Sequence, residues 1–153
     1  VDAVVHIAGG FEMGDAVHAL RRAAWDRMMN LNAWSFVAVT QALVPSMIER
    51  KAGRVVAVSA KTAARGAAGM AAYIASKSAL QGLVEAPPAE HAPHGITVNS
   101  IAPSVLDTSA NRQAMPQADP GQWVSTSVAA RTVAFLASPA AAALHGQHLT
   151  LDA

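Results

Sequence analysis

The chain has 153 residues, no cysteine and a formal net charge of +1. This length suits one domain with a substantial core, and 52% hydrophobic against 14% charged residues exclude a disordered chain. Without cysteine there is no disulfide, thiolate zinc site or thiol nucleophile. The charge gives no electrostatic case for nucleic acid or an anionic membrane surface as a partner, and no run approaches the ~18 uncharged apolar residues of a transmembrane helix.

The chain begins inside an apolar run. Val1–Ala8 predicts a strand that ends at Gly9-Gly10. The run has no basic n-region and no small-residue cleavage site, so it does not resemble a signal peptide. Because residue 1 is Val and the strand has no lead-in, we expect the chain to be one piece of a longer protein.

Helical and strand patterns alternate along the rest of the chain. Glu12–Leu20 is a polar connector with room for one helical turn, and apolar residues spaced by three and four predict a long helix from Trp25 to about Arg50, kinked or shortened by Pro45. The continuously apolar Arg54–Ser59 predicts a parallel strand covered on both faces. The remaining expected elements are a loop at Lys61–Gly69, a helix from Met70 to about Glu85 that must stop or bend at Pro87-Pro88, a strand at Ile96–Ala102 closed by Pro103, an irregular stretch at Val105–Pro120, a helix at Val128–Ala137 and a strand at Gln147–Leu151. This order predicts an α/β fold with a doubly wound parallel sheet and one domain, residues 1–153.

Tyr73, the single tyrosine, is followed four residues later by Lys77. On a helix the two side chains share one face. A nearby ammonium favours the phenolate and lowers the tyrosine pKa, so the pair could serve as a tuned acid and base. The pair alone is a weak signal, because a Tyr-x-x-x-Lys match is common.

Five segments strengthen this interpretation: Val5-His6-Ile7-Ala8-Gly9, the helix Trp25–Asn32, the strand Gly53–Ser59, Tyr73-Ile-Ala-Ser-Lys77, and Val98-Asn-Ser-Ile-Ala-Pro103 followed by Asp107-Thr108. In this order and spacing they resemble the short-chain dehydrogenase/reductase family, whose corresponding patterns are hxNNAG, the helix of the catalytic asparagine, the fifth strand, YxASK and VNxIxPG. The resemblance covers nearly the whole chain and implies the C-terminal portion of a Rossmann-type fold.

The resemblance implies hydride transfer between NAD or NADP and a small carbonyl- or imine-type substrate. Tyr73 would exchange a proton with that substrate, Lys77 would hold the nicotinamide ribose, and Asn32 would hold a water in a proton relay. The expected cofactor contacts include Tyr73 as well as Lys77, the hydroxyl of Thr108 on the carboxamide, Pro103 beside the nicotinamide, and the backbone of Ala8 and Gly9 near the adenosine half.

One departure from the family lies at its catalytic serine, which usually stands thirteen residues before the tyrosine. That position is Ala60. Ser59 is its neighbour, but neighbours on a strand face opposite sides, so Ser59 could act only if the strand end bends. An ordinary ketone or acyl reductase with an atypical Ser59 therefore stays open as an alternative.

The alternative without a serine resembles the dihydropteridine reductase branch of the family, which has an alanine and a following lysine at this point. That branch shares Ala8-Gly9-Gly10, Gly69-Met70, the stretch from Leu106 to Asp119 and Trp123. Quinonoid dihydropterin is already electrophilic, so a missing hydroxyl donor should cost less than with a ketone. In the same interpretation Met70 and Arg112 are candidates for substrate contact.

A second departure is larger, because the family's first half has no counterpart in these residues. That half carries the TGxxxGxG loop that receives the pyrophosphate and the residue that selects NAD or NADP. The rival interpretation is therefore a truncated, non-catalytic fragment or an oligomerising protein that cannot bind dinucleotide alone.

No metal site is expected, because the pairs His91/His94 and His145/His148 have no carboxylate in a zinc pattern. We expect a homo-oligomer, although Pro87-Pro88 is a third departure, because it interrupts a helix that is continuous in the family and usually helps to form the subunit interface there. The absence of targeting signals, with nicotinamide chemistry, favours a cytoplasmic location.

Overall fold

The computed structural model describes residues 1–153, apart from the side chains of residues 88, 89 and 92. Four parallel strands form the central sheet in the order β1-β2-β3-β6. Their bounds are β1 Ala3–His6, β2 Gly53–Val58, β3 Ile96–Pro103 and β6 His148–Leu151. A separate parallel pair joins β4, Leu106–Asp107, to β5, Val124–Ser125. The predicted α/β fold with a parallel sheet is confirmed.

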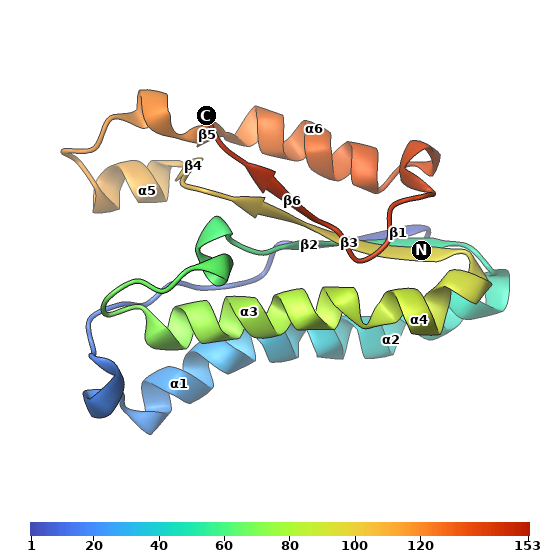
Figure 1. Cartoon of the computed structure of the whole chain (residues 1–153). Coiled ribbons are helices and arrows are strands. Elements are labelled where there is room, and N and C mark those ends of the chain that lie inside the picture. The colour runs from blue at the N-terminus through green and yellow to red at the C-terminus, as the bar shows by residue number, and fades with distance from the viewer.

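Helices cover both faces of the sheet (Figure 1). On one face lie α1 Arg22–Met29, α2 Ser35–Arg50, α3 Ala71–Glu85 and α4 Pro87–His91, and on the other lie α5 Ser109–Ala114 and α6 Thr126–Leu136. A π-helical turn, Asn30–Trp34, joins α1 to α2 without a break. Short 3-10 turns occupy Val17–Ala19, Lys61–Ala64, Ala92–His94, Pro120–Gln122 and Pro139–Ala141.

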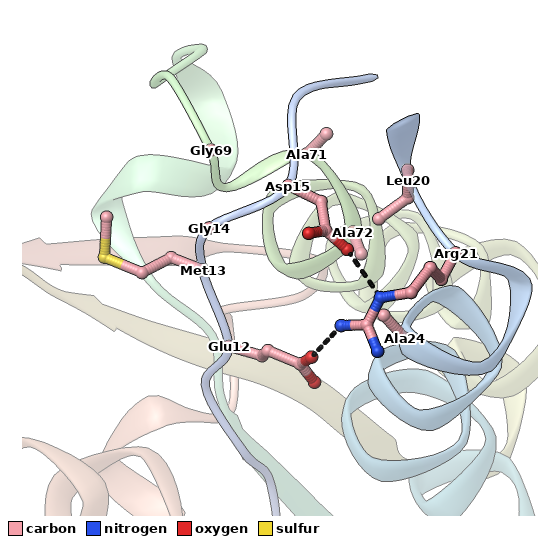
Figure 2. A pocket seen from close by; sticks show the side chains of 10 residues that line it. All are labelled: Glu12, Met13, Gly14, Asp15, Leu20, Arg21, Ala24, Gly69, Ala71 and Ala72. Atoms are coloured by element: carbon pink, nitrogen blue, oxygen red, sulfur yellow. Dashed lines mark hydrogen bonds and ion pairs between the residues drawn. The ribbon is translucent and has the colours of Figure 1, made fainter. Parts of the chain in front are cut away.

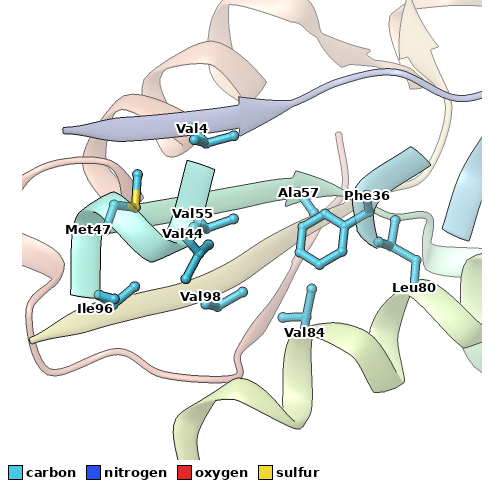
Figure 3. Packing of buried hydrophobic residues seen from close by; sticks show 10 residues of the cluster. All are labelled: Val4, Phe36, Val44, Met47, Val55, Ala57, Leu80, Val84, Ile96 and Val98. Atoms are coloured by element: carbon cyan, nitrogen blue, oxygen red, sulfur yellow. The ribbon is translucent and has the colours of Figure 1, made fainter. Parts of the chain in front are cut away.

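The larger hydrophobic core lies between the sheet and α2 and α3 (Figure 3). There Phe36 and Met47 of α2 and Leu80 of α3 are almost fully buried against strand valines. A smaller core on the other face packs Leu136 of α6 against Ile101. All eight residues of β3 are buried. Such a strand, covered on both faces, explains the continuous apolar runs in the sequence.

Most predicted elements are confirmed to within a few residues. The break at Pro87 is confirmed, because α3 ends at Glu85 and α4 starts as a separate helix at Pro87, a position that proline tolerates. Pro45 does not shorten α2, which continues to Arg50. The prediction of irregular structure at Val105–Pro120 is wrong in part, because β4 and α5 lie within it.

The continuous helix from Arg22 to Arg50 bears on the membrane prediction. It has 29 residues, and its most apolar window has a mean hydropathy of 1.3, so by length and composition it could cross a membrane. Its inner face packs on the sheet, and 28% of the window's residues are buried. Core helices pass the same test, so this helix is weak evidence for a membrane span.

The outer edge of β1 has no paired strand within the described part of the chain. Val5, which lies on this strand, and Ile7, which follows its last residue, are exposed. Beside them an apolar groove of about 420 Å³ runs between the sheet and α6, lined by Val58, Leu106 and Val133 among others. The fold therefore leaves apolar surface open on the α6 face.

Candidate active site

The candidate residues gather where β1, β2 and β3 end at their carboxyl side. Gly9 follows β1, Ala60 follows β2, and Pro103 is the last residue of β3. Parallel α/β sheets bind ligands at this edge. The π-helical turn and α3 bring Asn32 and Lys77 to the same place, because an added Cβ on Gly9 would lie 2.7 Å from Asn32 Oδ1 and 3.4 Å from Lys77 Nζ.

Asn32 joins the first loop to α3. It lies fully buried in the π-helical turn, a local geometry often found at functional sites. Its Oδ1 accepts a hydrogen bond from the Gly10 amide at 2.9 Å. Its Nδ2 donates to the Gly10 carbonyl at 3.0 Å and to Ser76 Oγ at 2.9 Å. Ser76 Oγ in turn donates to the carbonyl of Tyr73 at 2.7 Å. The side chain of Asn32 thus fixes both the loop and the helix that carries Tyr73.

The Lys77 ammonium is buried at the end of the sheet. Its Nζ donates a hydrogen bond to the carbonyl of Val58 at 2.9 Å, and the side chain is nearly inaccessible. Burial lowers the pKa of Lys77 to about 8, because a desolvated ammonium is less stable than one in water. Burial, together with the positive charge of Lys77, also lowers the pKa of His6. The Lys77 side chain is therefore mostly charged at neutral pH and loses its proton just above it.

Tyr73 differs from the sequence prediction in one respect. The expected effect of the Lys77 charge was a lowered tyrosine pKa, but burial raises the pKa of Tyr73 above its ordinary value. Lys77 Nζ is bonded to the backbone of β2, and desolvation of the phenolate dominates. Tyr73 is consequently a neutral phenol at physiological pH.

Ser59 and Ala60 lie on opposite sides of the extended chain. Ala60 has extended backbone angles, and the amide of Ser59 still bonds to the Ile101 carbonyl at 2.8 Å, so the strand alternation continues to this point. Ser59 therefore shares the face of Ala57, the face of the α2–α3 core. Ser59 Oγ is buried and has no hydrogen-bond partner among the described side chains. The strand end supplies no bend that would exchange the two positions.

The other predicted residues lie further along the loop after β3. The Thr108 hydroxyl caps α5 by accepting from the Asn111 amide at 3.1 Å, which leaves its proton free to donate. Arg112 is exposed and pairs with Asp107 through Nε at 2.6 Å. This pair holds the pKa of the Asp107 carboxyl below its usual range. Met70 is half-buried directly before α3, and the hydrogen bonds described for the Arg112 side chain go to Asp107.

Three contributors to the site were not singled out from the sequence. Ser76 lies inside the Tyr73–Lys77 segment, so its position in that motif was a usable signal. The Val58 carbonyl that holds Lys77 has no sequence signal, because any residue provides it. Phe11 lies edge-on to Tyr73, with ring centroids 4.9 Å apart. The two residues are far apart in the sequence, so no local pattern predicts this contact. Among the described residues no cluster of three metal-ligand side chains exists.

The residues present suit one half of a nicotinamide dinucleotide. Asn32 and Lys77 approach Gly9 too closely for a larger residue to stand there, and the ammonium of Lys77 and the free proton of Thr108 suit a ribose and a carboxamide. The pyrophosphate half finds no glycine-rich loop at a helix N-terminus within residues 1–153. The fit is therefore good for the nicotinamide end and incomplete for the rest.

Comparison with known proteins agrees with this geometry. The chain is 29% identical over 160 residues to the 3-oxoacyl-(acyl-carrier-protein) reductase of Vibrio cholerae, covering 99% of this chain and 65% of that protein. It is 32% identical over 108 residues to the acetoacetyl-CoA reductase of Allochromatium vinosum, covering 71% of this chain and 44% of that protein. The chain thus spans slightly less than two thirds of the length of the first of these relatives, and less than half of the second.

Solved structures show the same fold. A candidate NAD(P)-dependent gluconate 5-dehydrogenase from Beutenbergia cavernae, solved with NADP at low occupancy, superposes with a TM-score of 0.89 at 26% identity, covering 98% of this chain and 64% of that one. The short chain dehydrogenase family matches residues 1–119. The chain therefore belongs to the short-chain dehydrogenase family.

Proposed function

We propose that the protein containing this chain is an NAD(P)H-dependent reductase of small carbonyl- or imine-type substrates. The observation that carries the proposal is the close approach of Asn32 and Lys77 to Gly9 at the carboxyl end of the sheet, with the Lys77 ammonium buried and Tyr73 one helical turn before it on α3. Relatives with reductase activity in their names, acting on 3-oxoacyl and acetoacetyl thioesters, support the class of reaction.

Each of the three residues has a physical role in this reaction. Bound nicotinamide would supply the hydride, held by Lys77 on its ribose and by Thr108 on its carboxamide. The neutral phenol of Tyr73 donates its proton to the substrate oxygen or nitrogen as negative charge develops there. The Lys77 charge stabilises the phenolate that remains. Asn32 keeps the loop and α3 at the spacing that this transfer needs.

The substrate is proposed from the residue at position 60. A methyl group there donates no hydrogen bond, and the hydroxyl of the preceding residue, Ser59 Oγ, lies on the other face of the strand. A simple ketone would lose a donor on its oxygen, which costs on the order of 1–3 kcal/mol in a buried site. An already electrophilic C=N group, such as quinonoid dihydropterin, depends less on that donor. We therefore favour an imine-type substrate over the thioester ketones of the relatives.

The substitution Ala60→Ser tests this choice. The assay follows NADH or NADPH consumption with quinonoid dihydropterin and with ethyl acetoacetate, using the protein as encoded with any residues before Val1 retained. We expect Ala60→Ser to raise kcat/KM for the ketone about tenfold or more and to leave the dihydropterin rate nearly unchanged. If the unaltered protein reduces the ketone faster than dihydropterin, the imine preference is wrong, and if it reduces neither substrate, the reductase proposal fails.

The assembly is proposed to be a homo-oligomer formed through α2 and α3. A groove of about 490 Å³ lies between α3 and the π-helical turn that leads into α2, and Trp34, which lines it, is 58% exposed. Its lining is mostly apolar and includes Met29, Val37 and Leu83. A second copy of the same surface would cover it symmetrically. Trp34→Glu should shift the protein to a smaller species in light scattering, whereas Phe135→Glu on α6 should not.

The rival function is a non-catalytic chain that binds no dinucleotide by itself. The observation that favours it is the absence of a pyrophosphate-binding loop from residues 1–153. Titration of these 153 residues with NADH, followed by energy transfer from their three tryptophans, decides between the two. Saturable binding contradicts the rival, and no binding at millimolar NADH supports it for these residues alone.

A further inference from the structure

Phe11 is an exposed aromatic residue in contact with the proposed acid. Its side chain is 57% exposed, and its ring lies edge-on to Tyr73 with an interplanar angle of 78°. Single exposed apolar side chains are common and need no explanation. This one differs because it touches the only tyrosine of the chain and because the backbone on both sides of it is fixed.

Residues 10–15, which carry Phe11 and are called the strap below, are held in place by hydrogen bonds to other elements. Gly10 is bonded through both its amide and its carbonyl to the Asn32 side chain. Glu12, on the other side of Phe11, accepts a hydrogen bond from Arg27 Nε at 2.8 Å. The ring therefore sits between two anchored neighbours.

Further along, the same strap is tied to the residue before α1 and to the loop before α3 (Figure 2). Asp15 accepts from Arg21 Nε at 3.0 Å, and the Gly14 amide donates to the Gly69 carbonyl at 2.8 Å. Gly14 has a φ of 141° and Gly69 a φ of 70°, values that other residues rarely adopt. In Figure 2 Met13 points away from the arginine pairs.

These anchors have an energetic consequence for a ligand. Each exposed ion pair contributes little alone. Together with the Asn32 and Gly69 bonds, they restrict the strap before any ligand arrives. A group that packs on Phe11 then has less ordering entropy to overcome, which is the advantage of a preorganised contact.

We propose that Phe11 determines substrate specificity, because the exposed part of its ring stacks on a planar, conjugated group that adjoins the carbonyl or imine carbon reduced at Tyr73. This inference rests on the proposed function and narrows its substrate class to planar compounds. Aromatic pairs gain from offset or edge-to-face geometry beyond simple burial, which corresponds to roughly 3- to 10-fold in affinity. An alternative role for Phe11 is that of an apolar cover on Tyr73, for which ring planarity would be irrelevant.

Two variants separate these roles. Phe11→Leu keeps an apolar cover and removes the planar ring, and Phe135→Leu makes the same change at an exposed phenylalanine of α6, outside the site. The probes are acetophenone, which is planar, and cyclohexyl methyl ketone, which has similar size and no conjugated ring. Because Tyr73 is the single tyrosine, its ring signals in an NMR spectrum report binding at the site without any need for turnover.

The measurement titrates each ketone into the protein as encoded, in the presence of NADP⁺, and follows the Tyr73 ring signals. We expect acetophenone to saturate at a roughly 3- to 10-fold lower concentration than cyclohexyl methyl ketone. Phe11→Leu should abolish this difference, and Phe135→Leu should preserve it.

Equal saturation of the two ketones, an unchanged preference in Phe11→Leu, or no perturbation by acetophenone up to its solubility limit would overturn the proposal. A planar preference without turnover of any substrate would instead reject the reductase function and leave the stacking role of Phe11 standing. The two failures are therefore distinguishable.

Discussion

Replacing Lys77 with methionine should stabilise the folded protein at neutral pH and remove the proposed reductase activity. The ammonium is buried, and its pKa falls from 10.5 to about 8. At about 1.4 kcal/mol for each pKa unit, burial of the charged form costs roughly 3 kcal/mol at pH 7. Methionine removes that cost. It also leaves the Val58 carbonyl without its donor, which destabilises the folded protein by about 1 kcal/mol. The net expectation is a gain of roughly 2 kcal/mol in the free energy of unfolding.

The pH dependence gives the sharper test. The unfolded chain keeps the Lys77 proton up to about pH 10.5, whereas the folded protein releases it near pH 8. Between these values the unfolded state binds more protons, so the stability of the unaltered protein rises with pH. At pH 7 the free energy of unfolding of the unaltered protein is lower than that of Lys77→Met, and this difference should therefore disappear between about pH 8 and 10.5. Tyr73 is present in both proteins and cancels from the difference.

The assay is urea unfolding followed by tryptophan fluorescence at several pH values from 7 to about 10. Lys61→Met is the matched control, because the Lys61 side chain is 47% exposed and pairs with Asp152 at the surface. That change should cost less than about 1 kcal/mol. A Lys77→Met protein that is less stable than the parent at pH 7, or a stability gap that stays constant with pH, would refute the reasoning.

Two further predictions concern the same site. Tyr73→Phe should lower kcat by on the order of 10²- to 10⁴-fold, because the phenol proton is lost, while NADH affinity stays within about twofold. Steady-state rates measure the first effect and stopped-flow binding of NADH measures the second. A substantial residual rate would argue against Tyr73 as the acid. Gly9→Ala should destabilise the protein by about 1–3 kcal/mol, because the new methyl would lie 2.7 Å from Asn32 Oδ1 and must displace it from Gly10; an unchanged urea midpoint would contradict the close approach of Asn32 to this loop.

The main strands and long helices could be predicted because they are long and have a clear hydrophobic pattern. β2 is apolar over Val55–Val58 since both its faces are covered, and α3 follows a spacing that its buried residues confirm. The helix α5 was not predicted, because Ser109–Ala114 has no apolar face and depends on the Thr108 cap. Short elements of this kind carry little periodic signal.

The site divides in the same way between local and long-range information. Tyr73 and Lys77 share a helix, so their proximity follows from spacing alone. The contact of Phe11 with Tyr73 and the bonds of Gly10 to Asn32 join segments far apart in sequence, and only the folded chain brings them together. The direction of the Tyr73 pKa also depends on burial, which the spacing of two residues does not reveal.

The π-helical turn at Asn30–Trp34 makes the site sensitive to the number of residues in this helix as well as to their identity. A π turn accommodates one residue more than an α-helical turn of the same rise. Removing a single residue from it would let α1 and α2 merge into one regular helix, and the side chains of the turn itself would then point in new directions around the helix axis. Asn32 would then leave Gly10 and Ser76 even if every side chain in the site were retained. Insertions and deletions in this stretch should consequently be more damaging than most substitutions.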